Sequence, residues 1–115
     1  MLNLSARLQV FVCTRPTDMR KSFDGLHGLV QQVLRQDPLS GDLFVFLNRR
    51  RDRVKILAWE GDGLVIWYKR LEAGTFAAPQ GAGEALSLSA AQLALLLGGI
   101  DLAGTQPRKR YQRSA

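Results

Sequence analysis

The sequence has 115 residues, of which 46% are hydrophobic and 23% are charged, and its formal net charge is +6 at pH 7. A chain of this length fits one domain with one hydrophobic core, and its composition excludes a wholly disordered protein. No apolar run approaches the roughly 18 residues of a membrane span, and the first residues do not resemble a signal peptide. We therefore expect a soluble protein that is not exported and has no membrane partner.

The positive charge is concentrated in two short blocks. Residues 49–55 and residues 108–115 each carry a net charge of +4, whereas the rest of the chain is slightly acidic. Such clusters raise the local electrostatic potential and favour binding to a polyanion. The alternative interpretation is that residues 49–55 form only a solvated turn.

The first predicted element is a strand near residues 7–13. Leu8, Val10 and Val12 alternate with other residues that are partly apolar, which predicts a strand buried largely on both faces. Cys13 is the only cysteine. It cannot form an intramolecular disulfide, and we expect it to be a small buried hydrophobic side chain.

A helix is predicted over residues 22–35, where apolar side chains recur at helical spacing. Asp18 or Ser22 is placed to cap its start, and Pro38 prevents its continuation. The connection to the next element contains a Ser-Gly turn.

Three strands are predicted next. Residues 43–47 form an unbroken run of strand-forming residues, which indicates a central strand. Residues 54–59 and 64–69 have the composition of strands and are separated by a Glu-Gly-Asp-Gly turn. Together these segments predict an antiparallel meander.

The last predicted element is a helix over residues 89–98. Ser89 and Gln92 have the spacing of a capping box, and Gly98 stops the helix. The preceding segment, residues 77–85, is rich in Ala, Gly and Pro and is predicted to be a loop.

The predicted fold class is therefore α+β. We expect a single domain over residues 1–104, in which an antiparallel meander sheet of about four strands packs with two helices. Residues 105–115 lack apolar periodicity and are predicted to be a flexible basic tail.

The sequence offers no set of residues with the spacing of a catalytic or metal site. It has one histidine and one cysteine, which do not make a zinc ligand set, and no glycine-rich phosphate loop. The acidic residues are each explained as turn, cap or charge partner, and they do not suggest a two-metal nuclease. We expect no catalytic residue, no metal, no cofactor and no small-molecule substrate, so the protein is not predicted to be an enzyme.

Five motifs follow one another along the chain. They are Thr17 to Leu26; Asp37 to Gly41 leading to Phe44-Val45-Phe46; Arg49 to Leu57 with Trp59 to Gly63; Lys69 to Phe76; and Leu93 to Asp101. In order and spacing they resemble the TnpB accessory protein of the insertion sequence 66 family, and the resemblance covers roughly residues 8–102.

This resemblance implies a cytoplasmic bacterial protein encoded beside a separate DDE transposase, which assists transposition without carrying the strand-transfer triad itself. The implied partners are the phosphate backbone of DNA, the transposase of the same element and another accessory protein. Our hypothesis is non-catalytic DNA binding, at the ends of the element. The alternative is a protein-interaction adaptor that docks on the transposase without binding DNA, through a strand edge or Trp59 and Trp67. A third interpretation is RNA binding with aromatic stacking on Trp67 and Tyr68.

The candidate DNA-contacting residues are the basic residues of the two blocks and two further basic pairs. They are Arg20, Lys21, Arg49, Arg50, Arg51, Arg53, Lys55, Lys69, Arg70, Arg108, Lys109, Arg110 and Arg113. Phosphate contacts position a protein on DNA, whereas contacts to nucleobases specify sequence.

Overall fold

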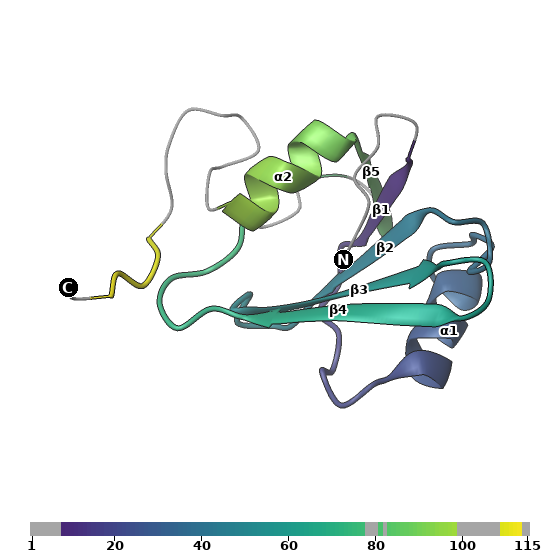
Figure 1. Ribbon diagram of the computed structural model, residues 1–115, viewed down its shortest axis with the longest axis horizontal. Helices are drawn as coiled ribbons and strands as arrows, with labels where there is room; N and C mark the ends of the chain where they lie inside the picture. Colours follow the sequence, from purple (N-terminus) through teal and green to yellow (C-terminus); the bar gives the residue numbers. More distant parts are fainter. Residues whose placement is uncertain (1–7, 78–80, 82, 99–108, 114–115) are drawn as a thin grey trace.

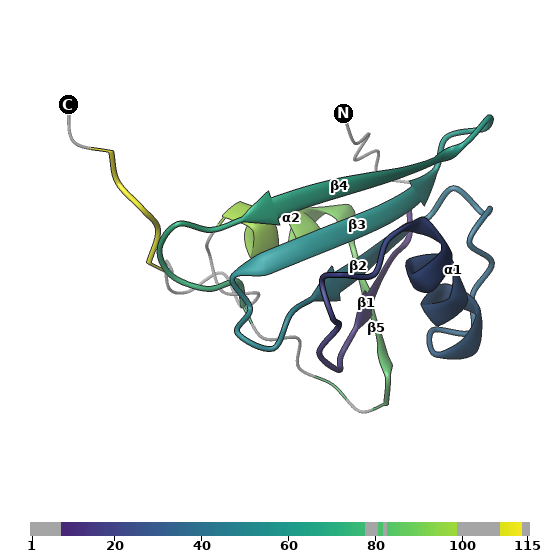
Figure 2. The same ribbon diagram turned by 90° about the horizontal axis from the view of Figure 1, so that it is seen from below.

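The fold is one five-stranded mixed sheet with a helix against each face. The computed structural model describes residues 8–77, 81, 83–98 and 109–113. The strands are β1 (Val10–Cys13), β2 (Leu43–Leu47), β3 (Arg53–Trp59), β4 (Leu64–Arg70) and β5 (Ala85–Leu88), and the helices are α1 (Phe23–Gln32) and α2 (Ala90–Gly98). The strand order is β4-β3-β2-β1-β5, with α1 and α2 on opposite sides of the sheet (Figures 1 and 2). Neither described helix is long and apolar enough to cross a membrane.

The predicted antiparallel meander is correct for three strands and wrong for the sheet as a whole. β2, β3 and β4 are successive antiparallel neighbours. β1, however, pairs parallel to β2, with Val10 opposite Leu43 and Val12 opposite Val45. Parallel neighbours need a long crossover connection, and α1 supplies it here. Alternating hydrophobicity predicts a strand but carries no information about its direction.

β5 is a strand that the sequence did not predict. It pairs antiparallel with β1, with Leu88 opposite Val10 and Ala85 opposite Cys13. Its first residue, Ala85, is the last residue of the predicted loop over residues 77–85. The strand has four residues, only two of them large and apolar, so its local signal is weak, and its backbone hydrogen bonds depend on β1.

Of the two helices, α1 departs further from its predicted boundaries. It ends at Gln32 rather than at residue 35, because Arg35 takes a left-handed conformation with φ 57°. Ser22 occupies the N-cap position without a side-chain hydrogen bond, and the carboxylate of Asp18 accepts instead from the backbone N–H of Arg20 at 2.9 Å. Neither side chain therefore caps the helix.

The capping box of α2 is confirmed. The backbone N–H of Ser89 donates to Oε1 of Gln92 at 2.9 Å, and that of Gln92 donates to Oγ of Ser89 at 3.1 Å. The domain boundary predicted at residue 104 lies outside the described residues.

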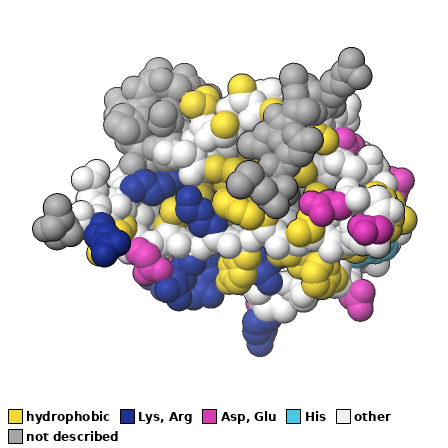
Figure 3. All heavy atoms as spheres, in the orientation of Figure 1, with side chains coloured by type: hydrophobic (Ala, Val, Ile, Leu, Met, Phe, Trp, Pro, Cys, Tyr) yellow, Lys and Arg dark blue, Asp and Glu magenta, His cyan; other side chains and the backbone are white. Residues whose placement is uncertain are grey.

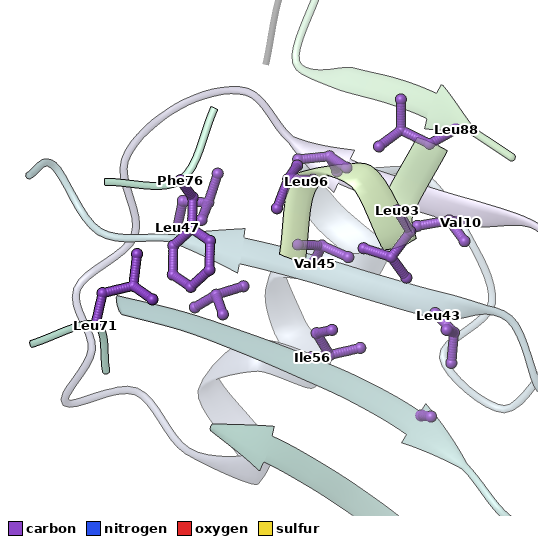
Figure 4. Close-up of a cluster of buried hydrophobic side chains, with 13 residues drawn as sticks. Val10, Leu43, Val45, Leu47, Ile56, Leu71, Phe76, Leu88, Leu93 and Leu96 are labelled. Atoms are coloured by element: carbon purple, nitrogen blue, oxygen red, sulfur yellow. The ribbon is translucent and has the colours of Figure 1, made fainter. Parts of the chain in front are cut away.

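Each face of the sheet contributes to its own hydrophobic cluster. On one face, Leu93 and Leu96 of α2 pack against the strands, and Phe76 covers the end of β2 (Figure 4). On the other face, Leu26 and Val30 of α1 pack against side chains that include Cys13, which is buried as predicted. β2 is buried along its whole length, which confirms it as a central strand.

Lys55 attaches the segment before α1 to the sheet. It lies on β3 with only 8% of its surface exposed. Its Nζ donates to the backbone carbonyls of Met19 at 2.8 Å and Lys21 at 2.7 Å, and it lies 4.7 Å from the centroid of the Tyr68 ring. A buried ammonium is tolerated when its hydrogen bonds are satisfied, and these contacts satisfy that condition.

We predict that Lys55→Ala lowers the free energy of unfolding by about 1–3 kcal/mol, because it leaves two carbonyl groups without their donor. The measurement is urea denaturation followed by circular dichroism. Lys69→Ala is the control, because Lys69 is exposed on the neighbouring strand and its replacement should change stability by less than about 0.5 kcal/mol. Equal effects of the two substitutions would contradict the role given to Lys55.

Candidate nucleic-acid interface

Most basic residues gather at one end of the sheet, which we call the basic end. The strand directions explain this, because β1, β2 and β4 finish there while β3 and β5 begin there. In Figure 3 the Lys and Arg side chains gather on the left, at the end where β4 finishes in Figure 1. The described basic residues of this end are Arg15, Arg20, Lys21, Arg49, Arg50, Arg51, Arg53, Lys69, Arg70, Lys109, Arg110 and Arg113.

The opposite end of the sheet is acidic. It carries the turn at residues 60–63 and the connection between α1 and β2. The acidic residues there are Asp37, Asp42, Glu60 and Asp62, accompanied by Arg35. Figure 3 shows Asp and Glu side chains mainly on the right, away from the basic group. This separation of positive and negative charge between the two ends orients the protein as it approaches a polyanion.

The loop between β2 and β3 is held in place by Asn48. Its Nδ2 donates to Oδ1 of Asp52 at 2.6 Å, and its Oδ1 accepts from the backbone N–H groups of Asp52 at 3.1 Å and Arg53 at 3.0 Å. Arg51 completes the turn with a φ of 56°, and its N–H donates to the carbonyl of Asn48 at 3.0 Å. The turn is therefore fixed by its own polar groups, and Arg49 and Arg50 are left exposed on it.

The Asn48 hydrogen bond also affects Asp52, whose pKa it holds below the usual range, with a smaller contribution from the neighbouring arginines. Asp52 therefore stays ionised at neutral pH and offsets part of the arginine charge.

The backbone of the β2–β3 turn also forms hydrogen bonds with the segment that follows β4. The N–H groups of Leu71 and Phe76 donate to the carbonyls of Asp52 and Arg51, each at 2.7 Å.

A shallow cavity of about 670 Å³ lies where the parallel strands β1 and β2 end. It is lined by Pro16, Thr17, Asp18, Met19, Asn48, Arg49, Arg50, Asp52 and Arg53. The N–H of Thr17 donates to the carbonyl of Leu47 at 2.8 Å, which joins its two walls. The carboxyl ends of parallel strands are a common place for ligands in sheets with helical crossovers.

Arg20 forms an ion pair with Asp18 at the edge of this cavity. Its Nη2 lies 2.7 Å from Oδ2 of Asp18, and its Nε donates to both carboxylate oxygens. Hydrogen bonding to Arg20 lowers the pKa of Asp18 to about 2. Arg20 is thus a weaker candidate for a phosphate contact than the arginines of the β2–β3 turn.

The two basic blocks, separate in the sequence, lie at the same end of the sheet. Nη1 of Arg110 donates to the carbonyl of Thr75 at 3.0 Å, and its guanidinium lies 5.3 Å from the centroid of the Phe76 ring. In both ribbon views, residues 109–113 lie at the end where β4 finishes. The tail predicted to be flexible therefore contacts the domain at Arg110. Arg113 is exposed in this segment, and Arg108 lies outside the described residues.

The remaining candidates differ in accessibility. Lys69 and Arg70 are exposed on β4, and Arg70 forms an ion pair with Glu72 at 2.8 Å, which raises the pKa of Arg70. Lys21 is exposed beside the carbonyl that Lys55 binds. Lys55 belongs to the basic block in sequence, but its Nζ is directed inward, toward two carbonyl groups.

Sequence reasoning missed Arg15 and Asn48. Arg15 follows β1 and lies 3.8 Å from Glu84 in an exposed ion pair. Its distance in sequence from both basic blocks concealed its place at the basic end. Asn48 carries no charge, so a search for basic residues overlooks it. The one sequence signal for its role in the turn is its position between the end of the predicted strand and the arginine run. The described residues contain no group of three or more His, Cys, Asp or Glu side chains placed to hold a metal ion.

Comparison with known proteins places the chain in a family. The family model described as IS66 Orf2-like protein, TnpB_IS66, matches residues 8–107. The chain is 42% identical over 101 residues to the "Uncharacterized protein y4hO" of Sinorhizobium fredii (strain NBRC 101917 / NGR234), covering 88% of each chain. It is 39% identical over 101 residues to the "Uncharacterized protein y4jC" of the same organism, covering 88% of this chain and 86% of the relative.

No solved structure matches the chain. The family match extends over the whole described sheet and both helices. It includes the β2–β3 turn and the cavity beside it, and it ends at residue 107, before the last basic block. The chain therefore belongs to the IS66 Orf2-like (TnpB) family, whose members are accessory proteins of IS66-type transposition systems.

Proposed function

We propose that this protein is a DNA-binding accessory factor of transposition, and that its basic end binds the phosphate backbone without catalysing a reaction. The observation that supports this most is the convergence of three separate segments, residues 49–53, 69–70 and 109–113, at one end of the sheet. Their charges act on the same region of space, so their potentials add. An acidic opposite end disfavours the reverse orientation on DNA.

The β2–β3 turn is the centre of the proposed interface. Arg49 and Arg50 are exposed on a backbone that Asn48 already fixes, so less conformational freedom is lost when they bind. The Nε of Arg51 is buried without a hydrogen-bond acceptor among the described residues. Because this atom is enclosed, Arg51 contributes to the interface through its charge, which adds to the positive potential of the turn.

Contacts of this kind position a protein on DNA without reading its sequence. Target recognition would then rest with the transposase of the same element or with another accessory protein, both of which we propose as partners because of the family membership. The ends of the element are the expected location of the complex.

A protein-interaction adaptor is the second candidate. β4 forms an edge of the described sheet, and Trp59 and Trp67 are only partly buried. An edge strand offers unpaired backbone groups to a partner strand. The adaptor hypothesis does not require the isolated protein to bind DNA. A titration of the isolated protein with duplex DNA therefore distinguishes the adaptor from the DNA-binding function.

We predict that replacing Arg49, Arg50 and Arg51 with alanine weakens binding to duplex DNA and lowers the slope of log K against log salt. If each arginine neutralises one phosphate, the slope falls by up to about 2.7, and by less where a side chain is turned away from DNA. The measurement is fluorescence anisotropy of a labelled duplex at several salt concentrations.

The matched control for this titration is Arg35→Ala, which removes an exposed arginine from the acidic end. It should leave the slope unchanged. Identical slopes for the wild type and the triple variant would show that these arginines are solvated surface, and the adaptor hypothesis would then replace DNA binding.

We further predict that Asn48→Ala weakens duplex binding although it removes no charge. Loss of the three hydrogen bonds makes the turn and its arginine side chains more mobile, and these must then be ordered when DNA binds. Ordering one long side chain costs about 0.5–1.5 kcal/mol, or roughly 2- to 12-fold in affinity. Ser40→Ala is the control, because Ser40 holds the acidic-end turn through Asp42 in a similar way. Unchanged affinity of Asn48→Ala, with both variants folded by circular dichroism, would contradict the proposed preorganisation.

A further inference from the structure

We infer that Tyr68, with Arg53 and Arg70 beside it, forms a binding site for an unpaired nucleotide, and that the ligand is single-stranded DNA. The inference rests on the proposed DNA-binding function and adds the form of DNA that the site accepts. The nucleobase would stack on the Tyr68 ring, and its phosphates would contact the two arginines.

The Tyr68 ring is exposed yet held in a fixed position. It lies on β4 with 47% of its surface exposed. Its hydroxyl accepts a hydrogen bond from Nη1 of Arg53 at 3.1 Å, and the Nζ of Lys55 lies 4.7 Å from its centroid. Lys55 is itself buried and held by two backbone carbonyls. A ring fixed on its inner side loses little conformational freedom when a second planar group stacks on its outer side.

The arginines beside Tyr68 are arranged as expected for an anion site. Arg53 and Arg70 are directly opposite one another on β3 and β4, and like charges at such positions destabilise a sheet. Glu72 offsets part of this repulsion through its ion pair with Arg70, whereas Arg53 has no carboxylate within ion-pair distance among the described residues. A bound phosphate would remove the remaining repulsion.

These side chains surround a common space. Arg53, Tyr68, Arg70 and Glu72 line a shallow cavity of about 300 Å³ on the outer part of the sheet. The combination of an exposed aromatic ring and flanking arginines is typical of single-strand binding surfaces, where stacking tolerates any nucleobase because each has a π-face. Within a duplex the nucleobases are stacked on one another, so only an open strand can present one to Tyr68.

The test compares a labelled single-stranded DNA oligonucleotide with its duplex by fluorescence anisotropy, using the full chain. Tyr68→Ala should weaken single-strand binding by about fivefold or more, which is the lower range for loss of one stacked nucleobase. Its effect on duplex binding should be less than about twofold, because paired nucleobases cannot stack on the ring and the turn that carries Arg49 and Arg50 is left intact. Tyr68→Phe keeps the ring and should retain most of the single-strand affinity.

Leu39→Ala is the matched control for burial, because Leu39 is 48% exposed and belongs to the connection at the acidic end. It should affect neither ligand. Equal losses for Tyr68→Ala on single-stranded and duplex DNA, or a loss for Tyr68→Phe as large as that for Tyr68→Ala, would overturn the inference. An oligoribonucleotide of the same sequence that binds more tightly than DNA, and depends on Tyr68, would show that the ligand was assigned wrongly.

If duplex binding depends on Arg49, Arg50 and Arg51 while Tyr68→Ala has no selective effect, only the single-strand site is wrong. If the wild-type protein binds neither form of DNA, both are wrong.

Discussion

The parallel pairing of β1 and β2 determines where the charges of this protein lie. Because both strands run in the same direction, the loop after β1 and the arginine turn after β2 meet at one end of the sheet. An antiparallel arrangement of these two strands would place Arg15 and the segment up to Lys21 at the opposite end, beside Asp42 and Glu60. The shallow cavity lined by Asp18 and Arg49 exists only because of this direction.

The basic end is stabilised by hydrogen bonds and by acidic side chains that offset part of its positive charge. Repulsion among arginines opposes this arrangement, and three kinds of contact counter it. Asn48 closes the β2–β3 turn, Lys55 holds the segment before α1, and carboxylates such as Asp52 offset part of the charge. The low pKa values of Asp18 and Asp52 mean that this offset persists until the pH falls well into the acid range. Stability from these two groups is therefore present at neutral pH and lost at low pH.

Local sequence signals predicted most individual elements. Residues 43–47 were recognised from an unbroken apolar run and the start of α2 from a capping box, and both are confirmed. Strand direction and the β1–β5 pairing were not predicted, because they depend on partners distant in sequence. The end of α1 was misplaced for a different reason, since the left-handed conformation of Arg35 has no strong residue signature.

The candidate site was predictable in composition but not in arrangement. Counting charges identified both basic blocks, whereas only the fold shows that residues 49–53 and Arg110 lie at the same end of the sheet. The same count included Lys55, whose amine is buried. It omitted Asn48, which has no charge but fixes the turn. A basic side chain in a strand can face inward or outward, and the sequence of this block does not distinguish the two.

The proposed DNA-binding function requires that one end of the sheet forms a continuous surface for DNA. The most direct measurement is an NMR titration of the uniformly ¹⁵N-labelled protein with a short duplex, in which amide chemical-shift changes are mapped onto the sheet. We predict changes concentrated in residues 14–21, 48–53, 69–76 and 109–113, with residues 37–42 and 60–63 unaffected. Changes centred on the acidic end, or spread evenly over both ends, would contradict it.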